Sequence, residues 1–162
     1  GVVIMDVGIN PAHVVHRAIM LYEAAAQLSS LQERERTRLS PELNAALDEG
    51  RSIARATYDR ALDRRNESVA FFTRWLAGYD AVMAPCAPGP APEGLDATGD
   101  PSCCTLWSLT GFPAIAIPVG LAPNGLPIGM QLVGRWGEDG MVCEVAKAYE
   151  AAWPWKDAWP SL

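Results

Sequence analysis

The sequence has no long hydrophobic run. No segment approaches the roughly 20 apolar residues that a membrane-spanning helix requires, so we expect no membrane association. The apolar residues 1–5 are interrupted by Asp6 and follow no basic segment, which is not the pattern of a signal peptide. The hydrophobic share of 49% is ordinary for a globular protein.

Basic residues are scarce as well. The chain has 13 Lys and Arg residues against 19 Asp and Glu residues, which gives a net charge of −6 at pH 7. Because phosphate binding requires a positive surface, this balance argues against nucleic acid as a partner. The densest charge run, residues 33–38, mixes both signs and is typical of a solvated helix end or loop.

The patterns that hold metals and cofactors are missing. His13 and His16 are the only histidines and lie three residues apart in a predicted helix. A zinc site needs three or four converging ligands, and no carboxylate or thiol is placed to join them. The sequence also contains no G-x-S-x-G, P-loop or G-x-G-x-x-G string. We therefore expect neither a metal nor a cofactor.

The four cysteines form no C-x-x-C pair, and Cys103 and Cys104 are adjacent in the sequence. This usage favours a reduced, cytoplasmic setting with thiols as small core or pocket residues. Cys103 and Cys104 lie at a predicted helix start, which favours the thiolate, and Cys86 lies in a proline-rich segment. A catalytic thiol remains the alternative, but it requires a nearby base.

The remaining pattern alternates helices and strands, and the length of 162 residues suits one α/β domain. Helices are predicted over residues 12–32, from Ser40-Pro41 to about 50, over 51–75, over 102–110 with Ser102 as cap, and over 139–153. Strands are predicted over residues 2–7, 79–85, 114–117 and 127–133. Prolines at 85, 88, 90, 92 and 101 make residues 85–101 a loop, and loops of this length are often functional.

The most informative stretch is Gly111–Gly134, in which two apolar runs lie between prolines and glycines. Residues 114–117 are apolar on both faces, which predicts a strand covered on each side. Asn124-Gly125 predicts the turn that follows. In the next run Ile128, Met130 and Leu132 share one face, and Gly129, Gln131 and Val133 share the other.

These motifs resemble the amidase signature family. Its members carry G-x-P-A-(apolar)₃-P-x-G followed by G-L-P-x-G-x-Q-(apolar)₂-G, and residues 111–120 and 125–134 fit both strings. Upstream, residues 79–85 resemble the family's Tyr-Asp strand, and residues 91–101 resemble a loop that precedes the G-x-P-A block. The resemblance implies part of a mixed β-sheet flanked by helices, as the C-terminal portion of such an enzyme.

Family members hydrolyse amides with two serines and a lysine from their N-terminal half. This chain has two lysines, Lys147 and Lys156, and no Gly-Ser-Ser or Gly-Gly-Ser loop. We therefore expect none of its residues to be catalytic. By resemblance, the intact enzyme cleaves a small-molecule amide through an acyl-serine intermediate, and this portion alone is inactive.

The resemblance also implies which residues approach the substrate. They follow the Tyr-Asp strand and precede the G-x-P-A block, and here they are Cys86, Cys103, Cys104 and Trp107. Trp107 suits a pocket for an acyl or aryl group, and a purely core position for it is equally compatible.

Two departures from the family pattern bear on the substrate. Ser108 stands where many members have asparagine, and Asp100 is out of register with the acid of glutamine-using members. Both departures favour a linear small amide or carbamoyl compound over a tRNA-dependent reaction. The alternatives are a non-catalytic interaction module, or one subunit of a split enzyme or amidotransferase complex. A homodimer, or a missing N-terminal half, is the protein partner we expect.

Overall fold

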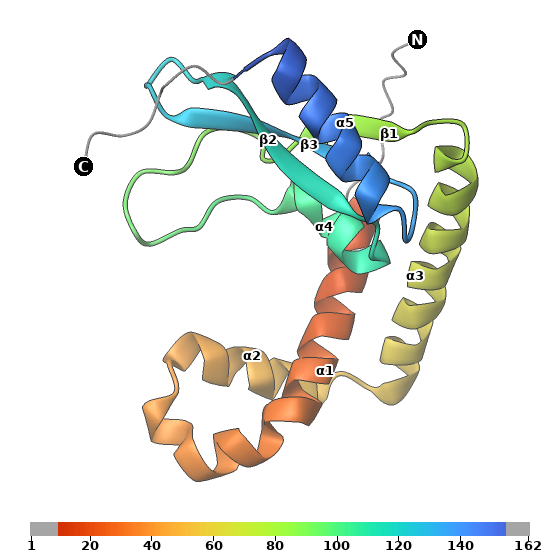
Figure 1. Ribbon diagram of the computed structural model, residues 1–162. Coiled ribbons are helices and arrows are strands. Elements are labelled where there is room, and N and C mark those ends of the chain that lie inside the picture. The colour runs from red at the N-terminus through yellow and green to blue at the C-terminus, as the bar shows by residue number, and fades with distance from the viewer. Residues whose placement is uncertain (1–9, 155–162) are drawn as a thin grey trace. The chain divides into compact units, whose positions relative to one another are not determined.

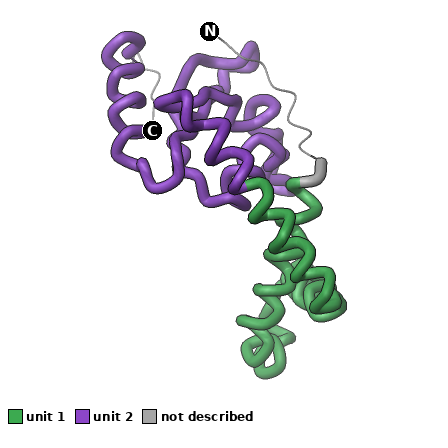
Figure 2. The backbone as a smooth tube through the Cα atoms, turned by 90° about the vertical axis from the view of Figure 1, so that its right-hand side faces the viewer, with its two compact units in different colours: residues 1–68 green, residues 69–162 purple. Residues whose placement is uncertain are grey.

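The computed structural model of the chain describes residues 10–154 (Figure 1). The chain divides into two compact units, residues 1–68 and residues 69–162 (Figure 2). The strand predicted over residues 2–7 and most of the Trp-Pro tail lie outside the described residues. The single-domain organisation stays a prediction.

The first unit is helical. It contains α1 (Asn10–Glu35), the short 3-10 helix η1 (Arg36–Arg38), α2 (Pro41–Ser52) and the first turns of α3 (Arg55–Leu76). The signal Ser40-Pro41 is confirmed as the start of α2: the Ser40 hydroxyl accepts a hydrogen bond from the Leu43 backbone N–H at 3.2 Å, and Pro41 occupies the first helical position.

The contact between α1 and α2 depends on Gly50. This glycine lies inside α2 rather than at its end, and it is buried. A Cβ atom there would collide with the Leu21 carbonyl oxygen and lie 2.8 Å from the Ala25 Cβ. Glycine therefore permits an approach of the two backbones that no other residue allows.

The helical period of the α1 sequence predicts a buried stripe of Val15, Ile19, Tyr22 and Ala26, but the structure buries a different face. The first three are half-buried, but Ala26 is exposed. Leu21, Ala25 and Gln32 are buried instead. The reason is that Gly50 of α2 packs against the side of α1 that carries Leu21 and Ala25.

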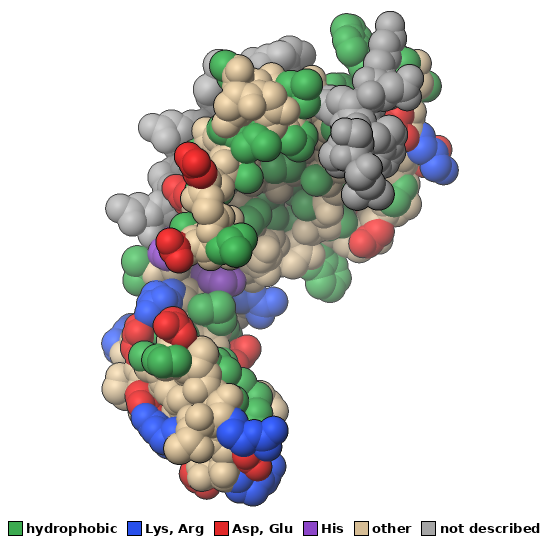
Figure 3. Space-filling model, turned by 90° about the vertical axis from the view of Figure 1, so that its left-hand side faces the viewer, with side chains coloured by type: hydrophobic (Ala, Val, Ile, Leu, Met, Phe, Trp, Pro, Cys, Tyr) green, Lys and Arg blue, Asp and Glu red, His purple; other side chains and the backbone are tan. Residues whose placement is uncertain are grey.

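Charged side chains of both signs lie on the face of this unit that Figure 3 shows. The run at residues 33–38 forms the last turn of α1 and η1, as predicted. Arg36 makes a bidentate ion pair with Asp48 of α2, in which its two terminal nitrogens donate to the two carboxylate oxygens at 3.1 and 2.5 Å. Its partial exposure limits the contribution of the pair to stability.

The third helix spans the boundary between the units and begins four residues later than predicted. Arg55 and Asp59 have the i, i+4 spacing that predicts an ion pair on a helix, and the pair is present at 2.8 Å. Phe72 and Leu76 are buried as the helical period predicts. The helix as a whole is half exposed, which confirms its amphipathic pattern.

The second unit contains a three-stranded sheet with one helix packed across one face and a second helix beside the central strand. The strands are β1 (Ala81–Pro85), β2 (Ala114–Leu121) and β3 (Pro127–Gly134), and the helices are α4 (Ser102–Thr110) and α5 (Asp139–Ala152). The order is β1-β3-β2, and both described pairings are antiparallel. Figure 1 shows α5 lying across β2 and β3. The α/β class is confirmed.

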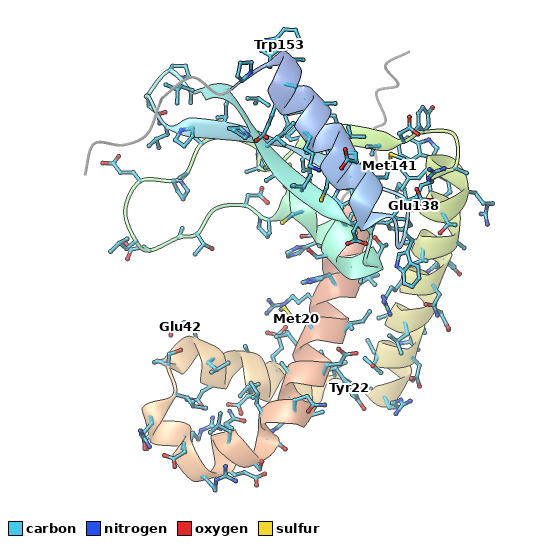
Figure 4. All side chains as sticks on the ribbon, in the orientation of Figure 1. Met20, Tyr22, Glu42, Glu138, Met141 and Trp153 are labelled. Atoms are coloured by element: carbon cyan, nitrogen blue, oxygen red, sulfur yellow. The ribbon has the colours of Figure 1, made fainter. Side chains whose placement is uncertain are left out.

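One face of the sheet and α5 form a hydrophobic core. Ile117 and Leu132 from the strands meet Val142 and Ala146 from the helix, and all four are buried. The helical spacing of Val142, Val145, Ala146 and Tyr149 in the sequence predicts this inner side, and the structure confirms it. Glu138 and Trp153 mark the two ends of α5 (Figure 4), and Trp153 is exposed.

Nothing in the described part of the chain covers the opposite face of β2 at its first residues. Ala114 and Ala116 are exposed, so the prediction of a strand covered on both faces is wrong for the described residues. The reason is that β2 is an edge strand and α5 covers only its isoleucine face. The Asn124-Gly125 turn is confirmed: Gly125 has a φ of 81°, and the Asn124 side-chain oxygen accepts from the Leu126 N–H at 3.2 Å.

Candidate functional site

A cavity of about 830 Å³ lies beside the proline-rich loop. The loop forms one wall, and the end of β1, the start of α4 and the first half of β3 form the others. Among its lining residues are Cys86, Pro101, Cys104, Val119 and Met130. Asp100 is the one charged residue that the described part of the chain contributes to this lining. The rest of the lining is uncharged and mostly apolar, so the cavity is suited to a largely apolar group and not to an anion.

The wall from residue 86 to residue 100 contains no helix or strand, as its prolines predict. It ends at α4, where Ser102 is the first helical residue and not the predicted cap. Pro101 occupies the cap position and supplies no side-chain acceptor. The Asp100 carboxylate instead accepts a hydrogen bond from the Ser102 N–H at 2.8 Å. Asp100 therefore satisfies a backbone N–H at the start of α4, which is the role that we expected of the Ser102 side chain.

Three thiols surround this end of the helix. Cys86 and Cys104 line the cavity, and Cys103 is half-buried beside them. Burial raises the pKa of the Cys86 thiol, and the neighbouring thiols of Cys103 and Cys104 raise it further. Because a nucleophilic cysteine needs a lowered pKa, this environment disfavours catalysis by Cys86 and suits a neutral lining group.

Trp107 is part of an aromatic core. Its exposed fraction is 8%, and its ring meets Phe72 edge-on at a centroid distance of 5.2 Å and Phe112 at 6.4 Å. It also lines a smaller hollow of about 310 Å³ together with Cys104, Ser108 and Gln131. The structure thus places Trp107 in the core and at a hollow, whereas Cys103 is not among the lining residues of either space.

Sequence reasoning missed Gln131. This residue lies on the central strand and is 5% exposed. Its side-chain nitrogen donates hydrogen bonds to the carbonyl oxygens of Pro85 at 2.8 Å and Cys103 at 2.7 Å. The one signal for it in the sequence is a polar residue within an otherwise apolar strand, because a buried amide requires partners.

Within residues 10–154 no group of three or more His, Cys, Asp or Glu side chains is arranged to hold a metal ion. His13 is exposed and His16 is half-buried on α1. The lysine of the described chain, Lys147, is exposed on α5 and pairs with Glu144 at 2.7 Å. No helix in this range is both long and apolar enough to cross a bilayer.

The family model of amidases matches residues 9–143. The chain is 37% identical over 102 residues to a glutamyl-tRNA(Gln) amidotransferase subunit of Brevibacillus brevis, covering 59% of this chain and 21% of that protein. It is 32% identical over 107 residues to 6-aminohexanoate-cyclic-dimer hydrolase of Paenarthrobacter ureafaciens, covering 54% of this chain and 22% of that protein.

Solved structures agree with the sequence matches. A crystal structure of an amidase superposes with a TM-score of 0.78 at 29% identity, covering 89% of this chain and 36% of the amidase. The chain spans about a fifth of the length of the curated relatives that it matches. Since the family model covers most of its residues, the chain belongs to the amidase family of hydrolases.

Proposed function

We propose that this chain is the C-terminal portion of an amidase that hydrolyses a linear small amide or carbamoyl compound through an acyl-serine intermediate. Its contribution is the wall of the substrate pocket. In this proposal Cys86 and Cys104 border the bound group, Cys103 supports them from behind, and Trp107 closes the smaller hollow. The serines and lysine of the reaction belong to the part of an amidase that this segment does not include.

The observation that carries the proposal is the cavity of about 830 Å³. Its volume is within the range of small-molecule sites, and its lining is apolar apart from a few polar groups. No arginine or lysine lines it within the described residues, so a phosphate or carboxylate group would find no charged partner there. This favours an uncharged amide or carbamoyl compound as the substrate.

A second candidate function has its own support. The relative from Brevibacillus brevis is by name one subunit of an amidotransferase, and its 37% identity exceeds the 32% of the cyclic-dimer hydrolase. The chain would then act within a multi-subunit enzyme that uses an amide as a nitrogen donor. A non-catalytic interaction module is the remaining form of this alternative.

The experiment has two stages. The purified 162-residue chain is first incubated with a panel of linear aliphatic amides, aryl amides, carbamoyl compounds and glutamine, and we expect no turnover. The chain is then grafted in place of the matching segment of a related amidase, and the panel is repeated. Retained turnover of uncharged amides supports the proposal. Preferential hydrolysis of glutamine favours the amidotransferase alternative, and turnover by the chain alone contradicts our view of its catalytic residues.

Matched variants of the graft test the pocket. Cys104→Phe fills the cavity and is expected to raise KM for the larger amides by roughly tenfold, since a blocked apolar subsite loses about 1–3 kcal/mol of binding. Cys143→Phe is the control, because Cys143 is exposed on α5 away from the cavity lining. Equal effects of both variants would remove the cavity from the proposal.

A further inference from the structure

The proline-rich loop lacks regular structure, yet it forms a wall of the cavity. A wall without helix or strand hydrogen bonds opens easily, so contacts at its two ends help to keep its shape. Its first end is the last residue of β1, Pro85, and its other end is the first turn of α4. Both ends converge on the same side chain.

That side chain is Gln131. Its single Nε2 atom donates to the Pro85 carbonyl at 2.8 Å and to the Cys103 carbonyl at 2.7 Å. An amide NH₂ group has two hydrogens, so these two bonds use its full donor capacity. The nitrogen is held in place because its backbone is on the central strand, paired with Ala84 of β1 and Ala116 of β2.

The loop end beside Pro85 is also close to β3. The Cys86 N–H donates to the Gly129 carbonyl at 3.1 Å, and its sulfur lies 3.3 Å from where a Cβ of Gly129 would be. A shift of Pro85 would therefore move Cys86 away from the strand and open the cavity at that point. The position of Cys86 thus reports on the state of the Gln131 bridge.

We infer that Gln131 is a positioning residue that fixes both ends of the proline-rich loop and so sets the shape of the cavity. In this role it acts through the loop. What the cavity binds rests on the function proposed above. The bridge itself is a property of this chain and can be measured without any amide turnover.

The main test compares Gln131→Met, which keeps the length of the side chain but cannot donate, with Gln27→Met, an exposed glutamine on α1. The measured quantity is the alkylation rate of Cys86 relative to that of the exposed Cys143. We expect this ratio to rise roughly tenfold in Gln131→Met, because two buried hydrogen bonds are lost. It should be unchanged in Gln27→Met. An unchanged ratio in a folded Gln131→Met protein overturns the inference.

A second variant gives a reversible readout. In Gln131→Glu the ionised carboxylate faces two carbonyl oxygens, whereas the protonated form can donate one hydrogen bond. The amide protection factors of Cys86 and Cys104, whose N–H groups are hydrogen-bonded at the two ends of the loop, should therefore recover as the pH is lowered, after correction for intrinsic pH dependence. A general loss of packing predicts no such recovery, and its absence counts against the inference.

The unmodified chain supplies a measurement that does not depend on whether a variant folds. Both Nε2 protons of Gln131 should exchange with solvent at least about tenfold more slowly than those of Gln27 in NMR spectra, since both are donated in a buried site. Equal exchange rates overturn the inference. In the grafted amidase, Gln131→Met should raise KM more than it lowers kcat. If Gln131→Met exposes Cys86 but the grafted amidase hydrolyses no amide, the Gln131 bridge is supported and the proposed function is wrong.

Discussion

The ring of Phe72 at the end of α3 packs edge-on against the indole of Trp107 on α4, with the ring centroids 5.2 Å apart. Phe112, just after α4, faces the same pair with centroid distances of 6.5 Å to Phe72 and 6.4 Å to Trp107. All three rings are buried. This cluster joins the helix before the sheet to the segment that leads into β2.

The first prediction concerns Trp107. Truncation to alanine removes a buried indole from this cluster and should lower the free energy of unfolding by about 3–5 kcal/mol. The control is Trp136→Ala, because Trp136 is 64% exposed and its loss should cost less than about 0.5 kcal/mol. Urea denaturation followed by circular dichroism measures both. Similar midpoints for the two variants would show that the aromatic cluster is not a core.

A pair of helical glycines gives the second prediction. Gly50→Ala places a methyl group against the Leu21 carbonyl and should destabilise the protein by about 1–3 kcal/mol. Gly140→Ala on α5 meets nothing within 4 Å and should stabilise it by up to about 1 kcal/mol through helix propensity. Thermal melting distinguishes the two. Stabilisation by both substitutions would contradict the close approach of α1 and α2.

The third prediction concerns pH and Asp48. The hydrogen bond from Arg36 lowers the pKa of the Asp48 carboxyl. The folded state therefore binds fewer protons than the unfolded state in the acidic range. The stabilisation is present above the ordinary aspartate pKa and is lost as the pH falls through the folded value.

Asp48→Asn should accordingly flatten the acidic limb of a plot of unfolding free energy against pH. Asp96→Asn in the exposed loop serves as the matched control. Superimposable acidic limbs for the native chain and Asp48→Asn would show that the ion pair with Arg36 contributes nothing in solution.

The fourth prediction uses the thiol of Cys86, whose pKa is raised mainly by burial. Its alkylation by iodoacetamide should reach half of its maximal rate at a higher pH in the folded protein than in urea. Because the folded state holds this proton longer, stability should also fall as the pH rises past the thiol pKa of the unfolded chain.

Replacing both neighbouring thiols separates the causes of that shift. Cys103→Ser with Cys104→Ser removes the smaller contributions and should move the Cys86 profile only part of the way toward that of the unfolded chain. A complete return to the unfolded profile would mean that the adjacent thiols, rather than burial, control its pKa.

Local signals predicted much of the fold. The inner face of α5 follows from the spacing of Val142 and Ala146, and the start of α2 follows from Ser40-Pro41, because each depends on residues within one or two turns. The Asn124-Gly125 turn is equally local. Such features need no knowledge of what packs against them.

Features that depend on distant partners were not predictable in the same way. Ala26 is exposed because α2 meets α1 on the side of Leu21, and nothing in the α1 sequence indicates which side that is. The role of Gln131 was missed for the same reason, since its two acceptors are 46 and 28 residues away in the chain. The cavity residues Cys86 and Cys104 were found through family resemblance, not through local pattern.

The open side of β2 also has a practical consequence for anyone who purifies this chain. No other strand of residues 10–154 pairs with the outer edge of β2, so this edge offers backbone donors and acceptors to an extended peptide, and Ala114 and Ala116 present little steric hindrance to its approach. Pro118 removes one donor, and the irregular register between Pro118 and Gly120 bends the strand there, so the vulnerable part is confined to its first half. Concentrated samples will therefore tend to aggregate by strand addition at residues 114–117, and charged substitutions on the alanine face are the place to improve solubility.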